Sequence, residues 1–210
     1  MGEWIGVAMA LVSSCLGGTA AAITRYLAGN ADPITLAILR WAIGFLCVLP
    51  AAVLLGAKWP RRGDWPAVAA LGIAFFGVFF VLYNIAMSYT TAARASLALA
   101  TLPLSTMVVG AVLGIERLTR RKPAGFLAVG MGAGAAALVA VGAFSGSLAT
   151  LRAFGASQWI AGLYLGIAGG ALAFILWVLA LERASPTRVA NTMTVNPIAA
   201  GLLAKQLVGE

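Results

Sequence analysis

The chain has 210 residues, of which 62% are apolar and 10% are charged, and its formal net charge is +8. A soluble domain is about half apolar and a quarter charged, so this composition excludes an ordinary soluble protein and indicates one that crosses a membrane several times. The sequence contains no histidine, which removes the commonest metal ligand and neutral-pH acid–base group; we expect no metal, no cofactor and no enzymatic activity.

Apolar runs long enough to cross a bilayer follow one another along the whole chain. A spanning helix needs about 20 mostly apolar residues. Seven runs meet this length, at 4–27, 33–57, 66–88, 95–115, 124–144, 159–181 and 187–208. They lack the apolar–polar alternation of transmembrane strands. The sequence therefore predicts an all-α, polytopic membrane bundle of about seven transmembrane helices in a lipid bilayer.

The basic residues gather in the short connections between these runs. With a cytoplasmic N-terminus, nine lie in connections that face the cytoplasm and three in the opposite ones, Arg25, Arg94 and Arg152. Because cytoplasmic loops carry an excess of Lys and Arg, this bias predicts a multi-pass protein of the cell (inner or plasma) membrane with its N-terminus in the cytoplasm. The positive charge is thus explained without nucleic acid, which we do not expect as a partner.

Arg40 lies seven residues into the second run, about 10 Å along a helix that rises 1.5 Å per residue. An arginine inside a membrane costs about 2.5–3.5 kcal/mol on insertion scales, so a functional role is the default interpretation. The functional interpretation is a contact to an anion or a gating pair in the cavity, and the competing one is a side chain that extends back to the interface; the two have about equal weight.

Residues 65–116 match residues 159–210 when the sequence is shifted by 94 positions, without a gap over 52 residues. The matches include residue types that seldom coincide by chance, namely Trp65 with Trp159, Arg94 with Arg188, Pro103 with Pro197 and Glu116 with Glu210. We interpret this as an internal repeat that relates spans three and four to spans six and seven. A shift of three spans reverses the direction of crossing, and inverted repeats are typical of secondary transporters.

Polar and aromatic side chains inside these spans are the candidates for a substrate-lining surface. Proline in mid-span frees the carbonyl four residues earlier, so Pro103 and Pro197 predict helix kinks that need polar partners or a wet cavity. The candidate lining residues are Arg40, Tyr83, Asn84, Thr101, Trp177, Asn191, Thr192 and Asn196. Helix–helix hydrogen bonding and core packing are the competing readings. Glu116, which closes span four, is a candidate for an ion pair or for proton coupling.

The chain resembles the EamA-type drug/metabolite transporters. The resemblance rests on the segments "DPITLAILRWAIGFLCVLP" and "LYNIAMSYTTAARASLALATLPLSTMVVGAVLGIERLTRRKPAGFLAVGMGAGAAALV", and on "LWVLALERASPTRVANTMTVNPIAAGLLAKQLVGE" near the end. It implies ten spans in two inverted repeats of five. Residues 1–144 then form the first repeat, 145–158 an extramembrane linker, and 159–210 a partial second repeat of two spans.

The resemblance implies a secondary transporter that moves a small organic metabolite or drug by alternating access. The alternative is a truncated, non-transporting fragment, or a subunit that works only as a dimer, because three spans of the second repeat are expected and not found. A homodimer is therefore a possible assembly.

Overall fold

The computed structural model describes residues 2–54, 56–101 and 124–209. Helices form nearly all of these ranges. The α-helices are α1 (Gly2–Leu27), α2 (Pro33–Leu54), α3 (Trp65–Gly72), α4 (Phe80–Met87), α5 (Ala92–Ala100), α7 (Ala124–Ser145), α8 (Ala156–Gly166), α9 (Ala173–Arg183), α10 (Pro186–Asn191) and α11 (Asn196–Val208). The 3-10 segments are η1 (Arg62–Asp64), η3 (Ser147–Ala153) and η5 (Thr192–Val195), and the π-helical segments are η2 (Ile73–Phe79) and η4 (Ile167–Leu172).

Within the described ranges, five helices are long and apolar enough to cross a membrane. They are Gly2–Leu27, Pro33–Leu54, Arg62–Met87, Ala124–Ser145 and Ala156–Arg183, of which the third and fifth run continuously through a π-helical segment. This agrees with an all-helical, multi-pass membrane protein.

The other two expected spans are not among the five. The first part of the expected span at 95–115 lies in α5, and the rest of that range lies outside the described residues. The span at 187–208 is helical, but Thr192–Val195 interrupts it with a tighter 3-10 turn. The number seven therefore stays a prediction.

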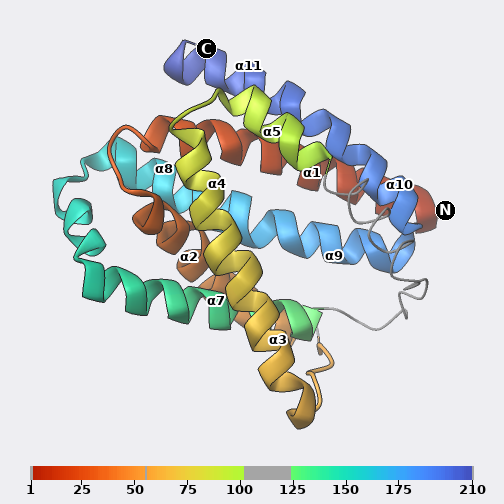
Figure 1. Cartoon of the computed structure of the whole chain (residues 1–210). Helices are drawn as coiled ribbons and strands as arrows, with labels where there is room; N and C mark the ends of the chain where they lie inside the picture. The colour runs from red at the N-terminus through yellow and green to blue at the C-terminus, as the bar shows by residue number, and fades with distance from the viewer. Residues whose placement is uncertain (1, 55, 102–123, 210) are drawn as a thin grey trace.

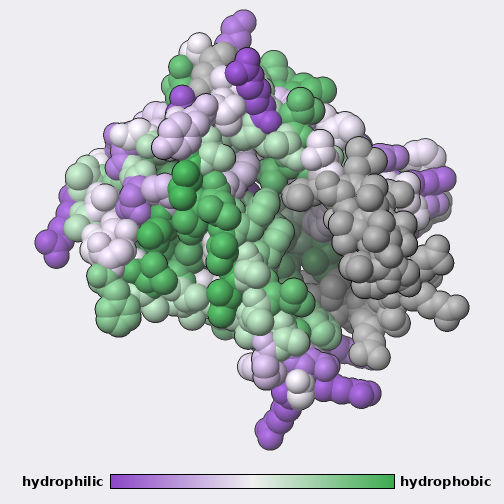
Figure 2. All heavy atoms as spheres, in the orientation of Figure 1, coloured by the Kyte–Doolittle hydropathy of each residue, from purple (hydrophilic) through white to green (hydrophobic). Residues whose placement is uncertain are grey.

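The helices pack around α1 and α2. Helix α1 packs along α11 and α9, and α2 packs along α7 and η4. In Figure 1, α11 and α5 lie along one side of α1, whereas α7 lies on the opposite side of the molecule. Apolar residues cover the centre of the face shown in Figure 2, and hydrophilic residues gather at its periphery. This distribution is the one that a bilayer imposes on a helix bundle.

Matching helices begin 94 residues apart. The third spanning helix starts at Arg62 and the fifth at Ala156, and their π-helical segments start at Ile73 and Ile167. Helices α5 and α10 start at Ala92 and Pro186. The sequence match is thus accompanied by a match in local structure, including an uncommon π segment. The inverted relationship of the two units stays a prediction.

Glycines let these helices approach to backbone contact. A Cβ atom on Gly72 of α3 would overlap the carbonyl oxygen of Gly130 in α7. The residue that the 94-residue shift pairs with it, Gly166 of α8, meets α2 in the same way, since its Cβ would lie 2.5 Å from Ile43 Cβ. Close approach at small residues is how helices associate in membranes, where burial of apolar surface drives little.

Candidate functional site

Arg40 lies in the interior of the bundle rather than at its end. Its side chain is 6% exposed, and Nη2 donates to the carbonyl oxygen of Gly169 in η4 at 3.1 Å. Its guanidinium carbon lies 5.0 Å from the ring centre of Trp41 and 4.9 Å from that of Phe80. Among the described residues no carboxylate pairs with Arg40, and its Nε has no hydrogen-bond partner. The side chain therefore does not extend to the interface.

The aromatic residues around Arg40 form the centre of the largest core cluster. Trp41 is fully buried and makes edge contacts with Phe76, Phe80 and Phe174, with ring centres 4.5–5.3 Å apart. Such edge contacts direct the positive rim of one ring at the negative face of the next. Arg40 is thus held against ring faces that partly compensate for its positive charge.

Two buried hydroxyl groups lie beside this aromatic cluster. Tyr83 of α4 is 8% exposed, its ring packs edge-on against Phe80, which also lies against the guanidinium group, and its hydroxyl faces that of Ser96 in α5. Neither hydroxyl has a hydrogen-bond partner of good geometry among the described residues. Buried polar groups in native proteins are nearly always hydrogen-bonded, so these two, with Arg40 Nε, mark an incomplete polar site.

Asn84 stands next to Tyr83 but faces a different partner. Its Nδ2 donates to the carbonyl oxygen of Pro33 at 2.9 Å, in the first turn of α2. This contact ties α4 to the start of α2. The Asn84 amide is therefore used in a hydrogen bond within the fold.

Two further candidates, Thr192 and Asn196, face α1. Ser14 Oγ and Thr192 Oγ1 lie 3.0 Å apart, and Thr192 Oγ1 also donates to the carbonyl oxygen of Val189 at 2.7 Å. Asn196 is 5% exposed, its side chain lies against Gly17, and its Oδ1 has no partner among the described residues. These two residues form a polar seam between α1 and the last helices.

The remaining candidates are scattered. Trp177 is half-buried against the small core cluster that contains Ala10 and Val189. Asn191 is exposed, and Thr101 is exposed with its hydroxyl bonded to the carbonyl oxygen of Ala98 at 2.7 Å. Pro197 is the second residue of α11, which follows directly on the 3-10 turn at Thr192–Val195. Pro103 and Glu116 lie outside the described residues.

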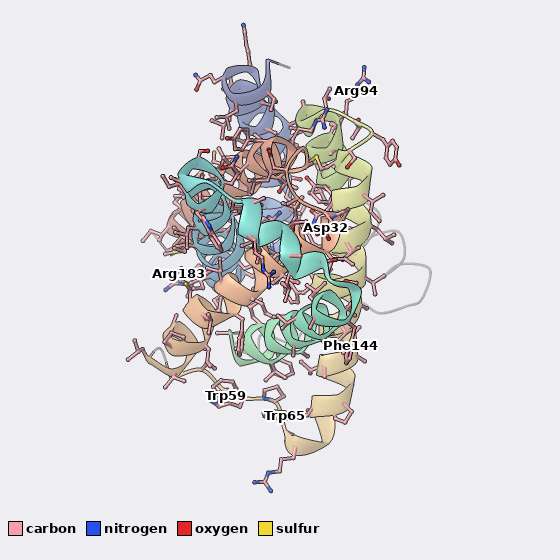
Figure 3. The ribbon with its side chains drawn as sticks, turned by 90° about the vertical axis from the view of Figure 1, so that its left-hand side faces the viewer. Asp32, Trp59, Trp65, Arg94, Phe144 and Arg183 are labelled. Carbon is pink, nitrogen blue, oxygen red and sulfur yellow. The ribbon has the colours of Figure 1, made fainter. Side chains whose placement is uncertain are left out.

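A polar cluster that the sequence reasoning missed closes one end of the bundle. Asp32 Oδ1 accepts hydrogen bonds from the backbone N–H groups of Ile34 and Thr35, at 3.0 and 3.1 Å, and so caps α2. Thr35 Oγ1 donates to Asp32 Oδ2 at 2.6 Å and lies 2.8 Å from the carbonyl oxygen of Ser147 in η3. Figure 3 views the molecule from this end, with Asp32 near the middle and Arg94 at the rim. The signal for the cap was Asp followed by Pro at the start of an apolar run.

Burial and hydrogen bonding act on Asp32 in opposite directions. Burial raises the pKa of the carboxyl group, but hydrogen bonds from Thr35, Ser147 and the backbone of Ile34 outweigh it, so the net pKa lies below its usual value.

The opposite end of the bundle is closed by an exposed ion pair, in which Arg188 Nη1 lies 3.1 Å from Glu3 Oε2.

Comparison with known proteins agrees with this architecture. The model of the EamA-like transporter family matches residues 4–135 and again residues 118–210. The chain belongs to the EamA-like transporter family. It is also similar to an uncharacterized transporter of Archaeoglobus fulgidus, with 30% identity over 132 residues, which cover 63% of this chain and 46% of the relative. The chain thus spans about half the length of this curated relative. No solved structure matches it.

Membership of this family supports a membrane transporter, and transporters of this kind are not generally enzymes. The described part of the EamA-like chain also contains no group of three His, Cys, Asp or Glu side chains placed to hold a metal ion.

Proposed function

We propose that the protein is a secondary transporter of the cell (inner or plasma) membrane, with a cytoplasmic N-terminus, that moves a small organic solute by alternating access. The observation that carries the proposal is the pair of long helices that start 94 residues apart and contain π segments at matching positions. Two similar units that cross the membrane in opposite directions can open a shared site to either side by rocking.

Contacts between helices support an inverted arrangement of the units. Helices α2 and α7 run antiparallel, because a Cβ on Gly44 would lie 3.5 Å from Met131 Sδ, while one on Gly142 would lie 2.5 Å from Ile38 Cδ1. Each of these two helices also packs through glycine on the long helix of the other unit, α2 on α8 and α7 on α3. A pseudo-two-fold axis between α2 and α7 accounts for both relationships.

In this arrangement α2 to α5 form one unit, α7 to α11 form the other, and α1 packs against the second. The sequence-based division after residue 144 counts α7 in the first unit. The two family matches overlap at residues 118–135 and allow either division.

The contacts at the two ends of the bundle fit a closed state of such a transporter. One end is held by Glu3 and Arg188, and the other by Asp32, Thr35 and the carbonyl oxygen of Ser147. Alternating access requires that the contacts at one end break while the contacts at the other end remain intact. The exposed ion pair is the easier to separate, because surface pairs contribute only about 0–1 kcal/mol.

A labelling experiment tests the proposal without knowledge of the substrate. Ser96 is fully buried, so Ser96→Cys, with Cys15 and Cys47 replaced by Ala, reports opening of the interior to a membrane-impermeant thiol reagent. We expect labelling in both right-side-out and inside-out vesicles. A disulfide between Glu3→Cys and Arg188→Cys should abolish labelling from the cytoplasmic side and leave the other side open. Labelling from one side alone, unaffected by the disulfide, contradicts alternating access.

The homodimer and the non-transporting fragment stay predictions. Mass measurement by light scattering of the protein in detergent distinguishes a monomer from a dimer, since the 210-residue chain has a mass of 21.4 kDa.

A further inference from the structure

We propose that Arg40, Tyr83 and Ser96 form a binding site for the carboxylate group of a small organic acid. This inference rests on the proposed function, because it names the class of solute that the transporter would carry. Its three residues come from α2, α4 and α5, and each carries a buried polar atom without a hydrogen-bond partner among the described residues, namely Arg40 Nε, Tyr83 Oη and Ser96 Oγ.

The charge of Arg40 favours an anionic ligand. Arg40 is buried inside a membrane span, and within residues 2–54, 56–101 and 124–209 its charge is compensated by one carbonyl oxygen and two aromatic ring faces. A buried ion without a counter-charge is strongly unfavourable, so buried charges in proteins are normally paired. A negatively charged ligand supplies the missing counter-charge, whereas a cation meets repulsion at the same place.

The shape of the guanidinium group favours a carboxylate among anions. Arg40 Nη2 donates one of its two N–H groups to Gly169, and Nε–H has no partner among the described residues. In the proposed site the N–H of Nη2 that lies beside Nε–H is left for the ligand, so these two donors point in parallel from one edge of a planar guanidinium group. That edge matches the two oxygens of a carboxylate and gives a bidentate contact.

The hydroxyl groups of Tyr83 and Ser96 supply further donors next to the same aromatic cluster, because the Tyr83 ring packs on Phe80, the ring that lies against the guanidinium group. Each is buried and faces the other, and neither makes a hydrogen bond of good geometry to a described residue, although a hydroxyl can both donate and accept. Towards an anion both act as donors, and hydrogen bonds to charged groups are the stronger kind. The rings of Trp41 and Phe80 beside the guanidinium group provide an apolar surface for the body of the acid.

The test uses three probes that share an aromatic ring and differ in charge: benzoate, neutral benzamide and the benzylammonium cation. Each is titrated onto the purified full chain in lipid nanodiscs, with binding measured by calorimetry and by the rise in unfolding temperature. We expect benzoate to bind at least about 10-fold more tightly than the other two, which is the effect of one hydrogen bond to a charged group. Equal binding of benzoate and benzamide overturns the inference.

Three variants separate recognition from folding. Tyr83→Phe and Ser96→Ala remove only unpartnered hydroxyl groups, so we expect unchanged or higher stability without ligand and about 10-fold weaker benzoate binding. Arg40→Lys keeps the positive charge but loses the two parallel N–H donors of the guanidinium group. It should weaken the binding of benzoate and leave the binding of benzamide unchanged. Tyr89→Phe is the matched control, since Tyr89 is 86% exposed and should change nothing. If Tyr83→Phe and Tyr89→Phe bind benzoate equally, Tyr83 has no part in the site and the inference fails.

The outcomes also separate this inference from the proposed function. Two-sided labelling of Ser96→Cys together with no preference for benzoate retains the transporter and removes the carboxylate site. Benzoate binding that depends on Arg40 and Tyr83, together with labelling from one side alone, retains the site and removes alternating access.

Discussion

The backbone of Asn196 occupies the place where a side chain on Gly18 would lie. A Cβ atom on Gly18 would overlap the carbonyl oxygen of Asn196 and would come within 2.8 Å of Ala199 Cβ. Helices α1 and α11 therefore meet at backbone distance, directly beside the polar seam that Ser14 forms with Thr192. The position of that seam therefore depends on residue 18 being a glycine.

Gly18→Ala should destabilise the protein, because the added methyl group must push α1 away from α11. Overpacking of this kind costs about 1–3 kcal/mol. The matched control is Gly201→Ala in α11, where the new Cβ would meet only Ala93 Cβ, at 3.7 Å. That control should be neutral or slightly stabilising, since Ala is the better helix former by about 1 kcal/mol. Unfolding in detergent, followed by circular dichroism, measures both, and equal midpoints would contradict the close contact.

The repeat predicts that Gly72→Ala and Gly166→Ala have similar effects. Each glycine lies in backbone contact with a neighbouring helix, Gly72 with Gly130 and Gly166 with Leu39 and Ile43. We expect each substitution to cost about 1–3 kcal/mol of unfolding free energy. Gly77→Ala serves as control, because the nearest atom to its new Cβ would be Ile73 Cγ2 at 3.8 Å. Loss of stability in only one of the equivalent variants would argue against structurally equivalent units.

The sequence predicted the helices well because hydrophobic length is a strong signal. The expected runs at 4–27, 33–57 and 124–144 correspond closely to α1, α2 and α7. The sequence could not predict the π segments at Ile73 and Ile167, since these residues are ordinary helix residues and the change in hydrogen bonding arises from packing. The 3-10 turn at Thr192–Val195 did have a signal, because Pro197 cannot donate to the helix.

The site was harder to predict than the fold. Arg40 was singled out because an arginine inside a membrane span is rare. Ser96 was missed, since one serine in an alanine-rich run looks like a small packing residue until α4 brings Tyr83 to it. Asn84 was paired with Tyr83 because they are neighbours in sequence, but adjacent helix residues point about 100° apart, and its amide bonds to Pro33.

The stability of the protein should fall in acid through Asp32. Because the pKa of Asp32 is lower in the folded protein than its usual value of about 3.9, the carboxylate stabilises the fold above that pH and loses this contribution as the pH falls through the lowered pKa. Asp32→Asn keeps an oxygen for the backbone N–H groups of Ile34 and Thr35 but no longer titrates. We expect the variant to be less stable by about 0.5–2 kcal/mol at pH 7, the usual range for a helix cap.

Unfolding midpoints in detergent between pH 7 and pH 3 measure the effect. The difference between the wild-type protein and Asp32→Asn should shrink in the acid range, where the wild-type carboxylate becomes protonated. Asp64→Asn is the control, since Asp64 is exposed and makes no side-chain cap contact to its helix. A constant difference between wild type and Asp32→Asn at every pH would show that the charge of Asp32 has no part in the cap.

The Ser14–Thr192 contact has a direction that mutagenesis can test. The single hydroxyl proton of Thr192 is used towards the carbonyl oxygen of Val189 at 2.7 Å, so Ser14 must donate in the 3.0 Å contact between the two side chains. Ser14→Ala removes a donor and leaves Thr192 satisfied, at a cost of about 0.6 kcal/mol, the average for a hydrogen bond between membrane helices. Thr192→Val leaves the buried hydroxyl of Ser14 without its acceptor and should cost more, about 1–3 kcal/mol.

The double variant no longer contains the unpartnered Ser14 hydroxyl. Its loss of unfolding free energy should therefore be smaller than the sum of the two single losses by at least about 0.5 kcal/mol. Strictly additive costs in a double-mutant cycle of unfolding free energies would mean that the two hydroxyl groups do not interact, and that α1 and the last helices are held together by their glycine contacts alone.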